Sequence, residues 1–181
     1  MVCLLHGTGP SRVFAGYVAA ERLEDLRTPP HFQIVTAYAG APHVFFFAPQ
    51  RLWYLIFQTA ASNYRPVYAT TKNIDDRRSW STPKPLVTKS DRGKWIDFWV
   101  ICDKTHPVPF YARDQRDVIA TTTSVAAFPN GFAHPKTVYR GVHEAVHVVR
   151  SKNSKPVDAA ADLEVAPNEV SSTLRTKVRT S

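Results

Sequence analysis

Residues 142–149 read VHEAVHVV, and within them His143, Glu144 and His147 carry groups that could do chemistry. Their spacing matches the H-E-x-x-H pattern, in which two histidines hold zinc and the glutamate acts as general base in peptide hydrolysis. That chemistry needs a helix, because a helix brings residues i and i+4 to one face, about 6 Å apart. In a strand the two histidines would lie about 13 Å apart, too far to share one ion.

The residues around this motif favour a strand. The segment is rich in β-branched valine, follows Gly141 and alternates with a period of two. No histidine follows His147 to act as a third zinc ligand. Two interpretations remain: a half-buried strand with surface histidines, or a strand that presents the carboxyl group of Glu144 from an apolar surface.

The bulk composition is that of one folded domain. The chain has 181 residues, of which 44% are hydrophobic and 12% aromatic. No run of about 18 apolar residues occurs, so no membrane partner is predicted. The opening MVCLLHGTGPSRVF shows no basic region followed by a long apolar region, so no secretion signal is evident. Cys3 and Cys102 neither require nor exclude a disulfide, and they form no metal-ligand cluster.

The basic balance of the chain has two interpretations. A formal charge of +8 would suit a polyanion-binding surface. The basic residues are scattered, however, as at 77–78 and 152–155, with no Gly-rich phosphate loop or aromatic RNA-binding motif beside them. Solvated surface charge is the favoured interpretation, and no nucleic-acid partner is predicted.

The chain divides into three stretches of different character. Residues 1–31 are predicted to be irregular, with room for one short helix in VAAERLEDL before two prolines end it. Residues 32–150 hold apolar runs bounded by turn residues, which predict strands: HVFFFAP, LWYLIFQT, WIDFWVIC and HEAVHVV. Residues 151–181 contain no aromatic residue and are rich in Ser, Thr, Lys and Asp, which predicts a disordered tail.

The middle stretch repeats itself. The sequence ATT at 69–71 recurs at 120–122, and PK at 83–84 recurs at 135–136. An apolar run precedes each ATT, and a turn-forming stretch with an aromatic precedes each PK. A unit of about fifty residues with several short strands is typical of a β-propeller blade. Chance similarity is the alternative, and two or three such units could not close a ring.

Five segments, in this order and spacing, resemble glycoside hydrolase family 62, the α-L-arabinofuranosidases that act on arabinoxylan: FFFAPQRLWYLIFQT, YATTKNIDDRRSWSTPKPL, WIDFWVICD, AAFPNGF and VHEAVHVV. The resemblance covers residues from about Phe32 to Val149. It implies an all-β fold, a five-bladed β-propeller with three acidic residues in its central pocket. This chain would supply about two to three blades of that propeller, followed by the disordered tail.

The resemblance also implies roles for particular residues. Asp97 corresponds to the aspartate that tunes the pKa of the general acid, and Glu144 corresponds to the general acid itself. Glu144 lies among valines, where desolvation favours the protonated form that an acid needs. Trp95 and Trp99 flank Asp97 and could present flat faces to sugar rings, with filling of the space between blades as the alternative. Gln58, at the end of LWYLIFQ, is a candidate substrate contact.

The general base does not carry over. The family holds it well upstream, in a motif resembling LKDFT, whereas Asp25 in LEDLRT lies only about twenty residues before FFFAP. Asp25 is therefore assigned to a surface helix. Beyond Val149 the strand pattern gives way to a polar tail, so we expect a chain that is truncated at both ends and lacks the base.

The leading hypothesis is hydrolysis of terminal α-L-arabinofuranosyl groups from arabinoxylan with inversion, by a fragment expected to be inactive or unstable alone. The alternatives are a family 43 type glycosidase, a non-catalytic carbohydrate-binding propeller remnant, and the zinc protease. The resemblance implies an extracellular monomer whose partner is arabinoxylan or an arabino-oligosaccharide. No cofactor is expected, and a structural cation on the propeller axis could not be assigned to particular residues.

Overall fold

The computed structural model describes side chains in residues 39–59, 65–86, 95–102, 107–114 and 116–141, and the backbone alone of strands at 2–9, 12–19, 32–33, 147–150 and 163–166. In these ranges the regular elements are β-strands and two short 3₁₀ turns. The predicted all-β class is therefore confirmed. No helix in the same ranges is long and apolar enough to cross a membrane.

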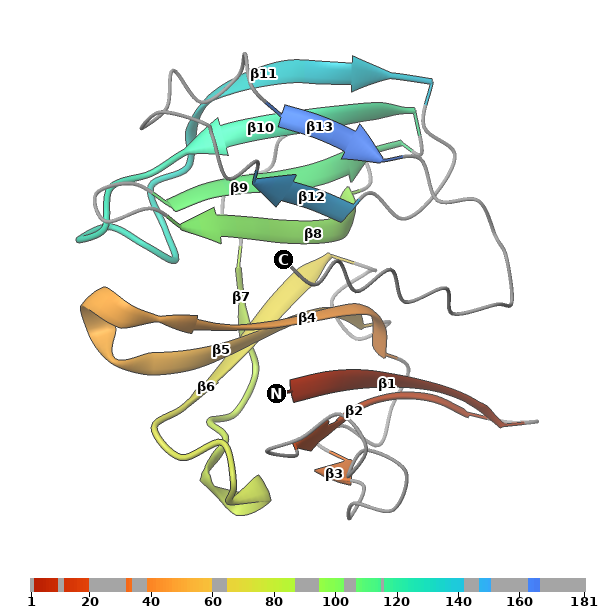
Figure 1. Cartoon of the computed structure of the whole chain (residues 1–181), viewed down its shortest axis with the longest axis vertical. Helices are drawn as coiled ribbons and strands as arrows, with labels where there is room; N and C mark the ends of the chain where they lie inside the picture. Colours follow the sequence, from red (N-terminus) through yellow and green to blue (C-terminus); the bar gives the residue numbers. More distant parts are fainter. Residues whose placement is uncertain are drawn as a thin grey trace, which may run out of the picture.

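Two four-stranded antiparallel sheets form the centre of the molecule (Figure 1). In each of them, neighbouring strands in the sequence are neighbours in the sheet. The first, sheet B, contains β4 (Ala39–Phe47), β5 (Leu52–Thr59), β6 (Pro66–Thr71) and β7 (Lys84–Pro85). The second, sheet C, contains β8 (Trp95–Cys102), β9 (Pro107–Arg113), β10 (Asp117–Thr122) and β11 (Ala133–Arg140).

The two sheets confirm that the sequence repeat is structural. The ATT sequences at 69–71 and 120–122 end β6 and β10, the third strand of each sheet. The PK sequences at 83–84 and 135–136 fall at the fourth strands, the first with Lys84 as the first residue of β7 and the second inside β11. The apolar run before each ATT forms the second strand. Recurrence of both short sequences in equivalent strands is not expected of a chance match.

The N-terminal stretch departs from its prediction. Strands β1 (Val2–Gly9) and β2 (Arg12–Ala19) pair antiparallel along their whole length, and β3 (Phe32–Gln33) pairs with β2. The prediction of an irregular segment is wrong for these residues. In VAAERLEDL, Val18 and Ala19 belong to β2, because pairing with β1 overrides a weak local preference for helix. Residues 20–26 of that stretch lie outside the described residues.

A two-stranded sheet follows near the other end. Strand β12 (His147–Arg150) pairs antiparallel with β13 (Leu163–Ala166). The strand predicted over 142–149 is confirmed for 147–149, and 142–146 lie outside the described residues. The prediction of a disordered tail is wrong for β13, whose apolar Leu163 and Val165 alternate as a paired strand requires; the remainder of 151–181 is not described.

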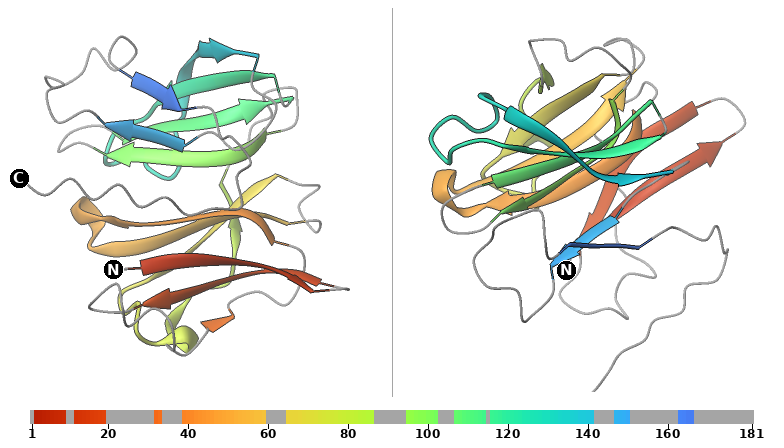
Figure 2. Two further views of the ribbon diagram at one scale, coloured as in Figure 1. Left: turned by 45° about the vertical axis from the view of Figure 1, so that its right-hand side comes forward. Right: turned by 90° about the horizontal axis from the view of Figure 1, so that it is seen from above.

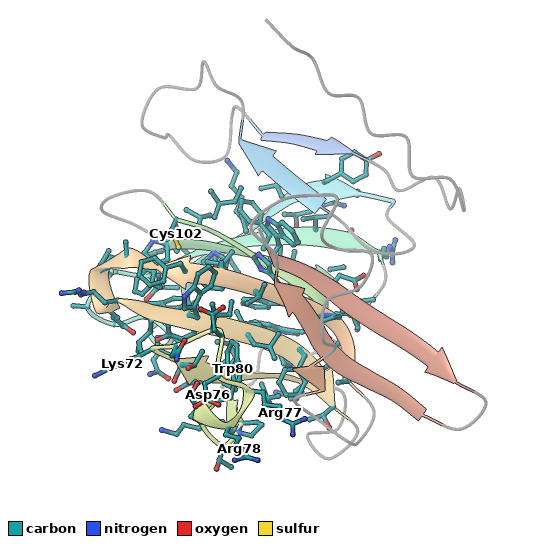
Figure 3. The ribbon with its side chains drawn as sticks, turned by 60° about the horizontal axis from the view of Figure 1, so that its bottom comes forward. Lys72, Asp76, Arg77, Arg78, Trp80 and Cys102 are labelled. Atoms are coloured by element: carbon teal, nitrogen blue, oxygen red, sulfur yellow. The ribbon has the colours of Figure 1, made fainter. Side chains whose placement is uncertain are left out.

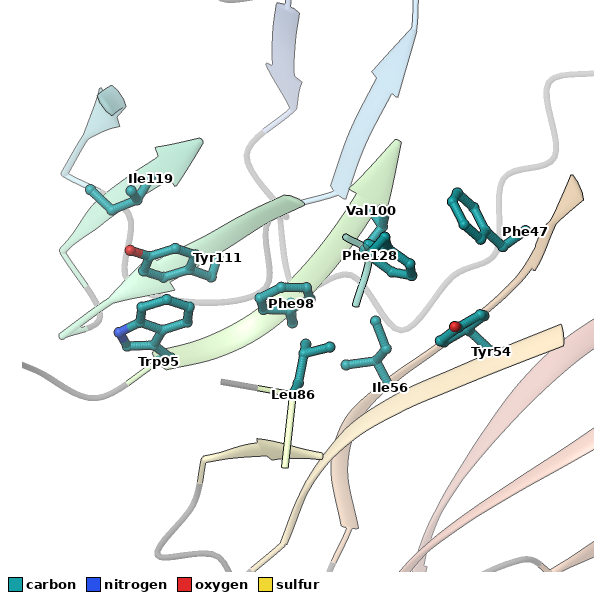
Figure 4. Close-up of a cluster of buried hydrophobic side chains, with 10 residues drawn as sticks. All are labelled: Phe47, Tyr54, Ile56, Leu86, Trp95, Phe98, Val100, Tyr111, Ile119 and Phe128. Carbon is teal, nitrogen blue, oxygen red and sulfur yellow. The ribbon is translucent and has the colours of Figure 1, made fainter. Parts of the chain in front are cut away.

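One apolar cluster fills the space between sheets B and C (Figure 4). Its fully buried members come from both sheets and from their loops: Phe47, Tyr54, Ile56, Leu86, Trp95, Phe98, Val100, Tyr111, Ile119 and Phe128. Burying each such side chain contributes about 1.5–3 kcal/mol to folding. The two sheets are therefore joined by a shared core, although each has its own hydrogen-bonded ladder.

The first strands of the successive sheets lie side by side. Strand β1 contacts β4, β4 contacts β8, and β8 contacts β12. Figure 2 shows the sheets following one another in this order, with β8 between β4 and the β12–β13 pair. A side chain on β8 is consequently near the middle of this row of strands.

The loop between β6 and β7 carries charge at the surface of sheet B. In its turn η4 (Arg77–Ser79), the carboxylate of Asp76 accepts a hydrogen bond from the backbone N–H of Arg78 at 2.9 Å. Arg77, Arg78 and Lys72 are exposed around this loop (Figure 3). They occupy a solvated turn, as the scattered-charge interpretation predicts.

Candidate active site

Asp97 differs from the other described acidic residues in its position within a strand. It is half-buried in β8, and it is the only Asp or Glu in either β4 or β8. The remaining acids with described side chains lie in turns or at a strand end: Asp75, Asp76, Asp114 and Asp117. A carboxylate in the middle of a row of packed strands is a candidate for chemistry in a way that a turn residue is not.

The backbone at Asp97 is also unusual. Its φ is +54°, and it lies in a β-bulge between Ile96 and Trp99, where the register with β9 shifts by one residue. Positive φ costs most residues about 1–2 kcal/mol, although aspartate tolerates it better than most. Bulges and strained residues occur preferentially at functional sites, where they direct a side chain that a regular strand would place elsewhere.

Strand β4 carries a matching bulge. Its register with β5 shifts between Gly40 and His43, and Ala41 within this bulge has a φ of +46°. Both sheets therefore begin with a bulged first strand, but only sheet C has a carboxylate there.

Trp95 belongs to the core and not to an open surface. Its exposed fraction is 6%, and its ring is stacked on Tyr111 with centroids 3.6 Å apart. Its buried Nε1–H has no hydrogen-bond partner among the described residues. The prediction that Trp95 offers an open face to sugar rings is not supported by this burial, and filling the space between sheets describes its position better.

The bulge explains why Trp95 and Trp99 differ. Strict alternation would put Trp95, Asp97 and Trp99 on one face of the strand. The extra residue instead turns Trp95, Phe98 and Val100 toward the core shared with sheet B, while Trp99 packs on the opposite cluster of sheet C. Trp99 is half-buried, and its ring is stacked on that of His43, with centroids 3.8 Å apart and planes at 4°.

Gln58 is buried rather than open to a ligand. Its exposed fraction is 6%, and its side-chain amide donates a hydrogen bond to the backbone carbonyl of Trp95. This contact joins the end of β5 to the start of β8. As a substrate contact Gln58 stays a prediction, whereas its contact with β8 is seen directly.

His43 is a residue that sequence reasoning did not select. It is 6% exposed, and its Nδ1 accepts a hydrogen bond from the backbone N–H of Val100 at 3.3 Å. Because Nδ1 accepts, the ring proton of the neutral imidazole is on Nε2. Its one sequence signal is a histidine inside an otherwise apolar run, AGAPHVFFF, which alone does not identify a partner.

Glu144, His143 and Asp25 lie outside the described residues, so their predicted roles rest on the sequence. His147 begins strand β12, where the zinc hypothesis requires a helix, and that hypothesis is wrong at this position. In the part of the chain that the structure describes, no three His, Cys, Asp or Glu residues gather as a metal site would require.

Comparison with known proteins places these features in a family. Residues 25–155 match the model of glycosyl hydrolase family 62. A curated relative, alpha-L-arabinofuranosidase C of Cellvibrio japonicus (strain Ueda107), is 38% identical over 104 residues, which are 56% of this chain and 16% of that protein.

Two solved structures have the same fold. The catalytic domain of the Coprinopsis cinerea GH62 alpha-L-arabinofuranosidase matches with a TM-score of 0.69 and 27% identity, over 84% of this chain and 52% of that one. The Podospora anserina alpha-L-arabinofuranosidase, solved with cellotriose, matches with a TM-score of 0.64 and 25% identity, over 81% and 50%.

The all-β architecture of repeated four-stranded sheets matches the fold of these two glycosidase structures. The chain belongs to glycosyl hydrolase family 62. It spans about half the length of the solved relatives and 16% of the curated one.

Proposed function

We propose that this chain carries part of the catalytic pocket of an α-L-arabinofuranosidase that removes terminal arabinofuranosyl groups from arabinoxylan. Asp97 is the carboxylate that orients the sugar and tunes the acid, and Glu144 is the general acid. The observation that carries the proposal is the position of Asp97: half-buried, at φ +54°, in a bulge on the strand between β4 and β12.

The arrangement of the sheets supports a propeller as the frame. We infer that sheet B and sheet C are successive blades of the five-bladed ring expected for the family. Four-stranded antiparallel sheets with strands in sequence order are the unit of a propeller. Their first strands lie side by side, as strands around a central axis would. On this inference, β1–β3 belong to the preceding blade and β12–β13 to the following one.

The place of Glu144 in the sequence supports the same proposal. It lies three residues before β12, the strand that contacts β8, so we assign Asp97 and Glu144 to the first strands of adjacent blades. An inverting glycosidase protonates the leaving oxygen with a carboxylic acid, the role proposed for Glu144, and activates water with a further carboxylate about 6.5–9.5 Å away, a role not assigned to Asp97. The family match over 25–155 includes both residues.

Arabinose release tests the proposal. The full chain is incubated with arabinoxylan oligosaccharides, and free arabinose is measured for the wild type and for Glu144→Gln. If the wild type releases arabinose, the proposal requires a loss of at least about a hundredfold in the variant, because general acid catalysis typically contributes that much. Full release by Glu144→Gln would reject Glu144 as the acid, and proton NMR of the first product formed reports whether the reaction inverts.

The same experiment separates the two glycosidase alternatives from the binding one. A family 43 type enzyme would release a different sugar or prefer arabinan to arabinoxylan. A carbohydrate-binding remnant would bind the oligosaccharide equally well in both variants and release nothing from either. Release that appears only in the culture medium of the native host would support the predicted extracellular location.

A further inference from the structure

Strand β8 is the edge strand of sheet C, so its backbone groups on the side away from β9 have no partner strand in that sheet. Two of these groups are bound by side chains of sheet B. The carbonyl of Trp95 accepts from the amide of Gln58, and the N–H of Val100 donates to Nδ1 of His43 at 3.3 Å. The two bonds stand on either side of Asp97, one before the bulge and one after it.

The spacing of these two bonds depends on the bulge. In a regular strand, backbone groups point to alternate edges, so residues an odd number apart face opposite ways. Trp95 and Val100 are five positions apart, yet both reach sheet B. They face their partners Arg113 and Pro109, which are four positions apart in β9. The one extra residue in the bulge at Asp97 makes the backbone groups of Trp95 and Val100 point to the same edge of β8. The two bonds therefore form together only when β8 is bulged.

His43 contacts the bulge a second time through its ring. The ring is stacked on Trp99, the residue at which the register with β9 resumes. Both Gln58 and His43 are 6% exposed, so water does not replace these contacts readily, and losing one leaves a buried polar group unsatisfied. A residue at positive φ persists where its surroundings determine its conformation in this way.

We propose that Gln58 and His43 are positioning residues for Asp97: from the neighbouring sheet, they hold β8 in the bulged register that sets the backbone of the catalytic carboxylate. The inference rests on the proposed function for its catalytic meaning. Neither residue is required to touch the sugar.

The test uses the full chain and two readouts. The first is the strong intraresidue HN–Hα NOE that a positive-φ residue gives at Asp97 in NMR spectra. The second is kcat and KM for arabinose release. Gln58→Met keeps the length of the side chain and removes the donor; His43→Asn keeps an acceptor near the place of Nδ1, and His43→Leu removes it.

We expect the NOE at Asp97 to weaken in Gln58→Met and His43→Leu and to be retained in His43→Asn. For the same two variants kcat should fall by about tenfold to a hundredfold with a smaller change in KM, as displacement of a catalytic group produces. Thr71→Val is the matched control. Thr71 is 3% exposed in sheet B, and its hydroxyl donates to the carbonyl of Asn73 at 3.0 Å, within the loop that follows β6.

The inference is overturned if Gln58→Met and His43→Leu lose no more of the NOE and of kcat than Thr71→Val does at equal loss of stability. If Gln58→Met does not fold, the pair His43→Asn and His43→Leu decides by the same criteria. If the wild type releases no arabinose, the NOE alone decides: loss in His43→Leu with retention in His43→Asn supports the positioning of Asp97, and equal intensity in both variants overturns it. Full arabinose release by Glu144→Gln, together with an NOE lost in His43→Leu and kept in His43→Asn, rejects the proposed function while supporting the positioning of Asp97.

Discussion

Strands β4 and β8 each begin a four-stranded antiparallel sheet, and each carries a bulge near its start with a non-glycine residue at positive φ. In β4 that residue is Ala41, and in β8 it is Asp97. The bulge therefore belongs to the repeated plan of the sheets, whereas the carboxylate belongs to sheet C alone. The candidate catalytic carboxylate therefore lies in a backbone feature that a sheet of this kind forms with or without an acidic residue.

Substitution of Asp97 tests most directly how the bulge of β8 differs from that of β4. Asp97→Asn removes the charge but keeps a side chain that tolerates positive φ, so we expect stability within about 0.5 kcal/mol of wild type and activity at least about a hundredfold lower. Asp97→Ala should lose activity equally and cost about 1 kcal/mol of unfolding free energy as well. Urea denaturation and arabinose release measure the two effects. Full turnover by Asp97→Asn would show that the carboxylate is not needed.

The core shared by sheets B and C predicts that the two sheets unfold as one unit. Tyr54 of sheet B lies in this core, and its phenol group makes the stability of the fold depend on pH. Burial, and secondly the neighbouring Tyr68, raises the pKa of Tyr54 to about 12 from its ordinary value of 10.0. The unfolded chain therefore releases this proton first, and the stability that the neutral phenol contributes is present below pH 10 and lost between pH 10 and about 12. The loss is on the order of 2 kcal/mol.

Urea unfolding followed from about pH 9 to about pH 11 measures this dependence. Tyr54→Phe has no such proton, and we expect its stability to fall less steeply over the same range.

Fluorescence of Trp53 in sheet B and of Trp95 in sheet C should change at one midpoint. Two separate midpoints would show that the sheets are independent.

A smaller loss of stability is expected at the contact between the β10–β11 loop of sheet C and the turn between β4 and β5 of sheet B. The amide of Gln50 donates to the carbonyl of Phe128 at 2.8 Å, and the Tyr54 hydroxyl donates to Oε1 of Gln50 at 2.5 Å. Gln50→Leu should cost about 1–2 kcal/mol, because it leaves polar groups without partners. Adding Tyr54→Phe should cost less in that background than in the wild type, which a double-mutant cycle measures. Strict additivity would contradict the coupling.

The smallest predicted effect concerns the other bulge. Ala41 gains nothing chemical from its φ of +46°, so Ala41→Gly should relieve strain and raise the unfolding free energy by about 0.5–1 kcal/mol, after the greater flexibility of glycine in the unfolded chain is counted. Thermal and urea denaturation measure it. A destabilised Ala41→Gly would mean that the methyl group packs better than its backbone angle suggests.

Much of the strand content could be predicted from local pattern. The runs HVFFFAP, LWYLIFQT and WIDFWVIC all form strands, and the fifty-residue repeat marks equivalent third and fourth strands. The N-terminal strands were missed because Ala, Glu and Leu near residue 20 favour helix, and a strand there depends on its pairing with β1. Strand β13 was missed for the same reason, since its partner β12 is outside its own segment.

The site was predicted less completely. Asp97 was proposed from the family resemblance of its segment, and its role stays a prediction. The contacts of Trp95 and Gln58 could not be predicted, because both depend on a bulge that alternation does not reveal. His43 was missed because its contacts with Trp99 and with the N–H of Val100 reach more than fifty residues along the chain.

Side-chain type and periodicity along the chain were enough to predict the strands and the repeated unit, because these properties are local, and the resemblance of its segment to the family pointed to Asp97. Which way each side chain faces was decided by packing. One inserted residue in β8 changes which face of the sheet each side chain after Asp97 points to. The groups that bind the backbone on either side of this bulge, Gln58 and His43, come from another sheet. A sequence read along its length contains both partners of such a contact, but only folding brings them together.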